Sequence, residues 1–198
     1  MSTDLRDKWD SRYREAEGLP GAAAVLADNV HLLPASGRAL DLACGLGANA
    51  LLLAERGLRT RAWDLSPVAV ERLQGVARAR GLTVEAEVRD VQREPPQPET
   101  FDVIVVSHFL DRELAPALMA ALRPGGLLFY QTFTRARVQD TGPSRAEFRL
   151  GENELLRLFA GLSLVAYREE GRIGDLERGF RNEALLIARR LPRPRAEP

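Results

Sequence analysis

Lysine, cysteine and histidine are scarce in this 198-residue chain. Its 28 Lys and Arg residues include one lysine, Lys8, so the other 27 are arginines, and there are two histidines and one cysteine. A lone cysteine, Cys44, cannot form a disulfide within the chain, and two histidines with one cysteine make a poor ligand set for zinc. The composition argues against a disulfide scaffold and against metal-dependent chemistry, so we expect no bound metal.

The chain also lacks an excess of charge and a long apolar run. Its 28 basic residues balance 28 acidic residues, so no net field draws it to a polyanion. No run approaches the roughly 18 apolar residues that span a bilayer, and residues 1–10 are polar. We expect a cytoplasmic protein whose partner is a small molecule, with no nucleic acid and no membrane. The composition leaves monomer and homodimer open.

The length fits one domain, since domains average roughly 150 residues. We expect a single domain over residues 1–190, in which residues 1–35 form an N-terminal helical cap or lid. The proline- and arginine-rich residues 191–198 are expected to be a disordered tail.

Short apolar runs alternate with stretches of helical periodicity, which predicts an α/β fold with a doubly wound, mostly parallel, seven-stranded sheet. Ser66 as N-cap and Pro67 at the first helical position mark one helix start, and Pro124-Gly125-Gly126 is expected to be a turn. Residues 170–180 are too loop-like for a crossover helix, so the last strand should be antiparallel. The expected strands are 38–43, 60–63, 83–88, 101–106, 127–133, 163–168 and 182–189.

A glycine-rich turn follows the first expected strand. Gly45, Gly47 and Ala50 match the loose dinucleotide fingerprint G-x-G-x-x-G/A, with Asp64 at the end of the next strand to hold ribose hydroxyls. Asp41 stands just before the turn, where a carboxylate favours a cationic ligand group over a pyrophosphate. The turn therefore predicts a ligand site, and an NAD(P)-dependent oxidoreductase is one alternative.

Asp41 followed by Ala43, Gly45 and Gly47 resembles the first motif of the class I S-adenosylmethionine-dependent methyltransferases, an acidic residue before G-x-G-x-G, with Ala43 in place of the first glycine. Further motifs follow in that family's order along nearly the whole chain. This resemblance implies a Rossmann-like fold, S-adenosylmethionine as cofactor and S-adenosylhomocysteine as product. It also implies cofactor-binding roles for the following residues: Asp41, Ala43, Gly45, Gly47 and Asn49 near the methionine part, Asp64 and Leu65 at the ribose, Asp90 and Val91 at the adenine, Ser107 and His108 as a pocket wall, and Trp9 and Tyr13 as a cover.

The resemblance extends to the tellurite-resistance methyltransferase branch. It rests on Trp9, Asp10 and Tyr13, on residues 62–67, on Tyr130-Gln131-Thr132-Phe133, and on the stretches 148–150 and 154–155. Where that branch has a His-Arg pair before its last strand, this chain has residues 176–181 without a histidine. The resemblance therefore does not carry tellurite over as the acceptor.

No residue is assigned a catalytic role by these patterns, but a few are candidates. His108 can act as a general base, since imidazole titrates near neutrality, or it can simply line the pocket. Arg145, Arg149, Arg178 and Arg181 lie in segments expected near the acceptor and can hold an anion.

We expect in-line methyl transfer to a small acceptor: a metalloid oxyanion, a thiol or another small metabolite. A non-catalytic cofactor-binding protein is the second alternative to a methyltransferase.

Overall fold

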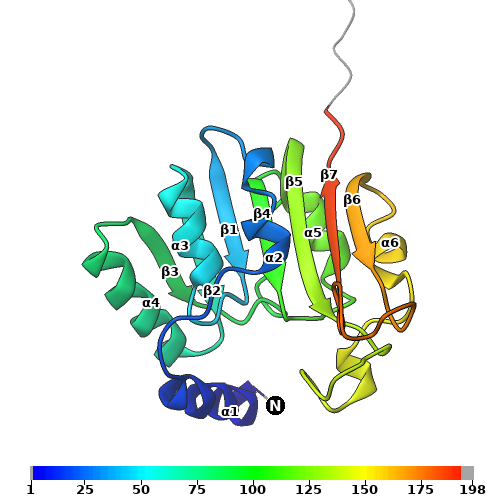
Figure 1. Ribbon diagram of the computed structural model, residues 1–198. Helices are drawn as coiled ribbons and strands as arrows, with labels where there is room; N and C mark the ends of the chain where they lie inside the picture. The colour runs from blue at the N-terminus through cyan, green and yellow to red at the C-terminus, as the bar shows by residue number, and fades with distance from the viewer. Residues whose placement is uncertain (1, 193–198) are drawn as a thin grey trace, which may run out of the picture.

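The computed structural model describes residues 2–192; Met1 and residues 193–198, most of the expected tail, lie outside the described residues. One seven-stranded sheet has the order β3-β2-β1-β4-β5-β7-β6 (Figure 1). The four pairs among β3, β2, β1, β4 and β5 are parallel, and β7 pairs antiparallel with both β5 and β6. The strands are β1 (Arg38–Leu42), β2 (Arg59–Asp64), β3 (Val84–Val88), β4 (Phe101–Ser107), β5 (Leu122–Phe133), β6 (Ser163–Glu169) and β7 (Glu183–Arg189). The predicted fold class is confirmed.

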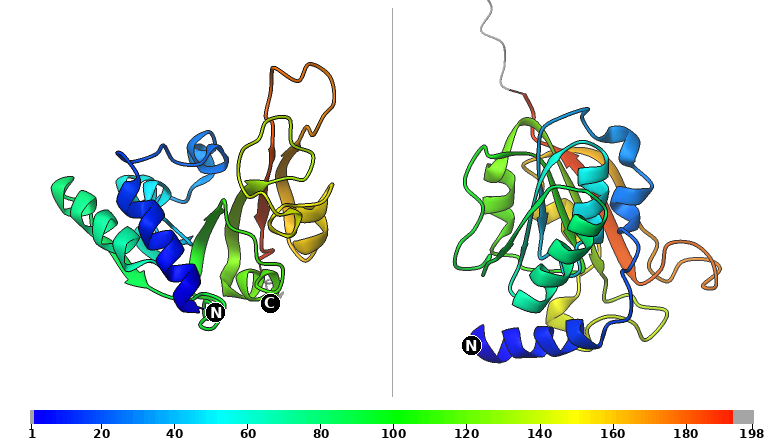
Figure 2. Two further views of the ribbon diagram at one scale, coloured as in Figure 1. Left: turned by 90° about the horizontal axis from the view of Figure 1, so that it is seen from below. Right: turned by 90° about the vertical axis from the view of Figure 1, so that its left-hand side faces the viewer.

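Helices cover both faces of this sheet (Figure 2). One apolar cluster packs α5 and α6 against β1, β4 and β5, and two others pack α2, α3 and α4 against the opposite face. The helices are α1 (Ser2–Glu15), α2 (Ala24–Ala27), α3 (Ala48–Glu55), α4 (Pro67–Ala79), α5 (Ala115–Ala121) and α6 (Glu154–Leu158), with short 3-10 turns η1 (Val30–Leu32) and η2 (Ala146–Phe148).

The strand order reverses between β1 and β4, which are parallel neighbours. In open α/β sheets, ligands bind beyond the carboxyl ends of the strands at such a reversal. Figure 1 shows α1 and the segment around η2 at this same edge, where the arrowheads of β1 and β4 end. The fold therefore brings an N-terminal helix and a late loop to the expected ligand edge.

The expected strand boundaries agree with the structure to within one residue, except at the start of β5, and two of the differences have a clear cause. Residues 124–126 do not form a separate turn, because Leu122 pairs with Phe101 and the strand continues through a register shift into the ladder that starts at Leu127. Gly125 at φ +88° allows this irregular stretch. The first strand ends at Leu42, one residue early, because Ala43 takes a positive φ of 54°.

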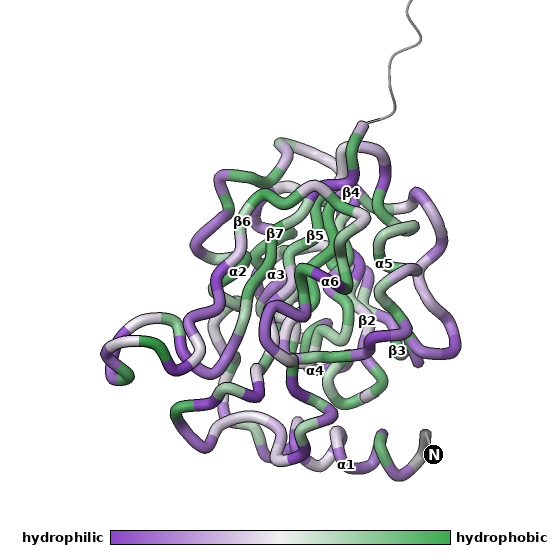
Figure 3. Tube along the Cα trace, turned by 90° about the vertical axis from the view of Figure 1, so that its right-hand side faces the viewer, coloured by the Kyte–Doolittle hydropathy of each residue, from purple (hydrophilic) through white to green (hydrophobic). Residues whose placement is uncertain are grey.

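Hydrophobic residues concentrate along the central strands, while α1 and the loops at the ligand edge are largely hydrophilic (Figure 3). β4 is buried along nearly its whole length, as expected for a strand covered on both faces. Within residues 2–192, no helix combines the length and the hydrophobicity that crossing a membrane requires.

Candidate cofactor and acceptor site

The loop between β1 and α3 has the backbone conformation that its glycines allow. Gly45 and Gly47 adopt φ of +52° and +78°, in the left-handed region. A Cβ at Gly47 would lie 2.4 Å from Cδ1 of Leu73, and one at Gly45 would lie 3.0 Å from Oη of Tyr13. The loop is thus pressed against α4 on one side and approached by α1 on the other.

Asp41 lies in β1 below this loop and is fully buried. Its Oδ2 accepts a hydrogen bond from the Ala50 amide at 3.0 Å, and its Oδ1 lies 3.5 Å from Nδ2 of Asn49. Burial raises the pKa of Asp41 to about 8, although these two hydrogen bonds act in the opposite direction. Asp41 holds the first turn of α3 to the end of β1.

Asp64, the last residue of β2, ties two loops together. Its Oδ2 accepts from the Gly45 amide at 2.8 Å and its Oδ1 from the Ser66 amide at 2.9 Å. Burial raises the pKa of Asp64, against the effect of these amides. Because the two carboxylate oxygens can accept about four hydrogen bonds, the amides of Gly45, Ser66 and Leu65 leave Asp64 some capacity for ligand hydroxyls.

Asp90, Val91 and Leu65 lie at the same edge of the sheet. Asp90 follows β3, accepts from the Gln92 amide at 3.2 Å and pairs with Arg93 at 3.6 Å. Val91 is buried in the cluster that holds α5, and half-buried Leu65 follows Asp64.

The helix α1 is anchored beside the glycine loop. Trp9 and Tyr13 stack with their ring centroids 5.6 Å apart. Asp10, which is 7% exposed, accepts a hydrogen bond from the Ser66 hydroxyl. Arg72 of α4 donates to the Tyr13 carbonyl and, at 2.9 Å, to that of Ala16. These contacts bring the predicted cover to Gly45.

Asn49 connects the glycine loop to β4. Its Nδ2 donates to Oγ of Ser107 at 2.9 Å, and its Oδ1 accepts from the Ala23 amide at 2.9 Å. His108 follows Ser107 with a positive φ of 54°, and its imidazole lies 3.0 Å from Oε1 of Glu183. Asn49 therefore joins Asp41 and Ser107 in one hydrogen-bond network.

The four candidate arginines make contacts within their own loops. The guanidinium of Arg149, a residue only 3% exposed, donates to the carbonyls of Pro143, Thr134 and Thr141. Arg181 donates to carbonyls within residues 170–178. Arg145 pairs with Glu147 and exposed Arg178 with Asp175. The contacts of Arg149 stabilise the loop after β5, and those of Arg181 stabilise the loop before β7, at the carboxyl edge of the sheet.

The sequence analysis assigns no role to three residues of this region: Arg72, Asp10 and Glu183. Asp10 belongs to the motif with Trp9 and Tyr13, but its partner Ser66 lies 56 residues away in the sequence. Glu183 had a weak signal, because a carboxylate that opens an antiparallel last strand lies at the carboxyl edge of the parallel ones.

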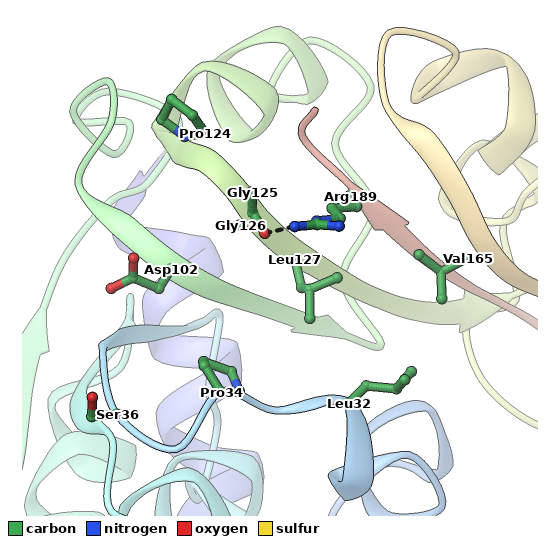
Figure 4. Close-up of a pocket in the computed structure, with 10 residues that line it drawn as sticks. All are labelled: Leu32, Pro34, Ser36, Asp102, Pro124, Gly125, Gly126, Leu127, Val165 and Arg189. Atoms are coloured by element: carbon green, nitrogen blue, oxygen red, sulfur yellow. Dashed lines mark hydrogen bonds between the residues drawn. The ribbon is translucent and has the colours of Figure 1, made fainter. Parts of the chain in front are cut away.

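A hollow of about 560 Å³ lies at the opposite edge of the sheet (Figure 4). Ser36 precedes β1, Asp102 lies near the start of β4, and Arg189 ends antiparallel β7, so this is the amino edge. The glycine loop and the strand-end carboxylates lie at the other edge, and they define the candidate site.

The charge of the site tests which ligand fits. Asp10, Asp41 and Asp64 are 7%, 0% and 6% exposed, and none of them forms an ion pair within the described part of the chain. Buried carboxylates without a cation favour a positively charged ligand. The fold and this site define a Rossmann-like protein with an acidic candidate ligand site at the carboxyl edge of its sheet.

Comparisons with known proteins agree with that class. Residues 39–126 match the model of a methyltransferase domain. The chain is 31% identical, over 89% of its length and 75% of the relative's, to the ubiquinone biosynthesis O-methyltransferase of Methylocella silvestris. It is 27% identical to TehB of Haemophilus influenzae, a probable S-adenosyl-L-methionine-dependent methyltransferase, over 73% of this chain and 52% of that protein.

The crystal structure of Haemophilus influenzae TehB superposes with a TM-score of 0.67 at 23% identity, covering 93% of this chain and 66% of that one. The chain belongs to the class I S-adenosylmethionine-dependent methyltransferases and resembles the TehB branch. Its cofactor is S-adenosylmethionine, so the oxidoreductase alternative falls away.

Proposed function

We propose that this protein transfers the methyl group of S-adenosylmethionine to a small molecule bound between the glycine loop and the segment 134–154. The observation that carries the proposal is the set of three buried carboxylates around the loop, Asp10, Asp41 and Asp64, which form no ion pair with any of residues 2–192. A sulfonium cofactor supplies the complementary charge, and it supplies a methyl group with a good leaving group already attached.

The residues of the chain divide the binding between them. We assign the ribose to Asp64 with Leu65, the adenine to Asp90 with Val91, and the amino group of the methionine part to Asp41 with Asn49. Gly45 and Gly47 give close backbone access, Ala43 shapes the turn, Ser107 and His108 wall the pocket, and Trp9 and Tyr13 cover it.

Catalysis in this site rests mainly on orientation. The network from Asp41 through Asn49 to Ser107 fixes the loop relative to β4, and Tyr13 above Gly45 helps to exclude water. A fixed, dry site aligns the acceptor atom, the methyl carbon and the sulfur. The acceptor classes that fit this scheme are a metalloid oxyanion, a thiol or another small metabolite.

Ligand-induced stabilisation tests the cofactor part of the proposal. S-adenosylhomocysteine should raise the melting temperature of the wild-type protein, whereas NADH should not. Asp64→Ala should reduce the affinity for S-adenosylhomocysteine by about tenfold or more, since a hydrogen bond to a charged group contributes about 1.5–3 kcal/mol. Asp28→Ala, which removes an exposed carboxylate next to α2, is the matched control and should keep the full shift.

Methyl release tests the transfer itself. Radiolabelled S-adenosylmethionine would be incubated with a set of phenols, thiols, small amines, selenite and tellurite, and the methylated product would be counted. Binding of the cofactor without transfer to any member of the set would favour the non-catalytic alternative.

A further inference from the structure

A histidine and a glutamate meet at the carboxyl edge from two separate strands. His108 follows β4, and Glu183 opens β7, with Nε2 and Oε1 3.0 Å apart. Gln131 of β5 donates to the second carboxylate oxygen at 2.5 Å, while its own Oε1 accepts from the Val25 amide at 2.7 Å. Both oxygens of Glu183 are thus held in place, and the carboxylate in turn fixes the imidazole.

A base must be accessible to the acceptor, whereas the carboxylate that orients it can be buried, and the two side chains differ in exposure in this way. The His108 side chain is 45% exposed and the Glu183 side chain 16%. Burial by itself raises the pKa of Glu183, but the hydrogen bond and charge of His108, followed by the hydrogen bond from Gln131, outweigh it and lower the pKa. Glu183 is therefore ionised near neutrality, so Nε2 of His108 donates to it and Nδ1 carries the lone pair.

The imidazole lies between the residues assigned to the cofactor, Asn49 and Ser107, and Phe133, which we place beside the acceptor. Its neighbour Ser107 accepts from Asn49, which belongs to the first turn of α3 and to the network of Asp41. On the other side, the imidazole stacks on the Phe133 ring at 4.9 Å with an interplanar angle of 28°. Among residues 2–192, no hydrogen-bond partner of Nδ1 is found.

The groups around the imidazole favour a neutral acceptor over an anion. Glu183 contributes a negative charge, and the nearby guanidinium of Arg149, 5.6 Å from the Phe133 ring, is held by three carbonyl groups. Arg112 is likewise paired with Glu154 at 2.6 Å. The partly exposed His108 ring, which stacks on Phe133, offers an aromatic surface on which a planar acceptor can stack.

We propose that His108 is a catalytic base, that Glu183 is its positioning residue, and that the acceptor is a neutral phenol-type hydroxyl compound. This inference rests on the proposed methyl transfer. An oxygen lone pair of the acceptor forms the bond to the methyl carbon as the carbon–sulfur bond breaks, and the electron pair of that bond goes to sulfur. The hydroxyl proton passes to Nδ1 of His108 and then to water.

The chemistry explains why such an acceptor needs a base. A phenol with a pKa of about 10 is only about one part in a thousand ionised at pH 7, and a positioned general base contributes about 10²–10⁴ in rate. A metalloid oxyanion already presents an unprotonated oxygen or a lone pair, and it would meet the charge of Glu183. The His108–Glu183 pair is therefore useful to a hydroxyl acceptor and of no use to an oxyanion.

The test uses the purified full chain with catechol and phenol as probes and selenite as the oxyanion comparison. His108→Asn keeps a residue that tolerates positive φ, and its turnover is compared with wild type at a saturating concentration of S-adenosylmethionine, so that a change in cofactor affinity is not counted as a loss of kcat. It should lose about 10²–10⁴ in kcat on the phenol probe. His31→Asn, which changes the other histidine in η1, is the matched control and should leave kcat unchanged. Glu183→Gln should lower kcat with little change in KM.

Added imidazole provides a second measurement that a structural role would not affect. His108→Gly also suits the positive φ, and free imidazole should restore part of its activity on catechol. Full kcat in His108→Asn, transfer to selenite with none to either phenol, or no transfer to any of these probes would overturn this inference. The proposed cofactor role fails separately, if the wild-type chain does not bind S-adenosylhomocysteine.

Discussion

At the scale of single residues, two costs decide which side chains the glycine loop accepts: the cost of a positive φ and the steric collision of a side chain with its neighbours. Ala43, Gly45 and Gly47 all have positive φ, which costs an L-residue with a side chain about 1–2 kcal/mol. Ala43 tolerates this cost, whereas a methyl group at Gly47 would also collide with Leu73. The replacement of the family's first glycine by Ala43 is therefore compatible with the loop, and the same change at Gly47 is not.

Asp41 gives a residue-scale prediction about stability. Burial raises its pKa in the folded, ligand-free protein to about 8, against about 3.9 in an unfolded chain. Between these values the folded state holds a proton that the unfolded state has lost. The free energy of unfolding should therefore fall as pH rises from about 4 to 8, with this group contributing up to about 1.4 kcal/mol per pH unit.

Asp41→Asn should remove that contribution, since the amide keeps the oxygen that accepts from Ala50 but has no proton to lose. Urea unfolding at pH 5 and pH 8 measures the difference: wild type should lose more stability between these pH values than the variant. Asp28→Asn is the control and should follow wild type. Equal losses in wild type and Asp41→Asn would contradict the assignment.

At the scale of elements, α1 is a separate helix attached to the domain by few contacts. Its sequence is mostly polar and charged. Two contacts anchor it: Asp10 accepts from the Ser66 hydroxyl, and Arg72 donates to the carbonyls of Tyr13 and Ala16. The Arg72 contacts satisfy carbonyls at the end of the helix, where they have no partner in the helix itself. Removal of this one side chain should loosen the cover without disturbing the sheet.

Arg72→Gln should therefore accelerate proteolytic cleavage within residues 2–20 and lower the free energy of unfolding by about 1.5–3 kcal/mol, the range for hydrogen bonds that involve a charged group. Limited proteolysis with mass spectrometry would locate the cleavage. Arg78→Gln changes an exposed arginine on the same helix α4 and should behave as wild type. Unchanged cleavage in Arg72→Gln would show that other contacts hold α1.

At the scale of the whole molecule, features that depend on neighbouring residues could be predicted from the sequence, and contacts between residues far apart in the sequence could not. Strands, helix starts and the glycine turn follow from local patterns, such as Ser66-Pro67 and the apolar run of β4. The pairing of His108 with Glu183 spans 75 residues, and it depends on β7 being inserted between β5 and β6. Sequence periodicity does not specify that strand order, so the pairing of His108 with Glu183 could not be predicted. It does not specify which loop carbonyls accept hydrogen bonds from Arg149 either, so the structural role of Arg149 could not be predicted.

The strand order also predicts how stability is distributed across the molecule. β4 lies at the centre and is almost fully buried, whereas β3 and β6 are edge strands with several exposed residues. In hydrogen exchange, amides of β4 should be protected longest and those of β3 and β6 should exchange early. S-adenosylhomocysteine should add protection at residues 41–50, 64–67 and 9–13, and none at β6, which lies at the far end of the sheet from the glycine loop. Equal added protection in all strands would contradict a site confined to the carboxyl edge around the glycine loop, because it would indicate a global stabilisation instead.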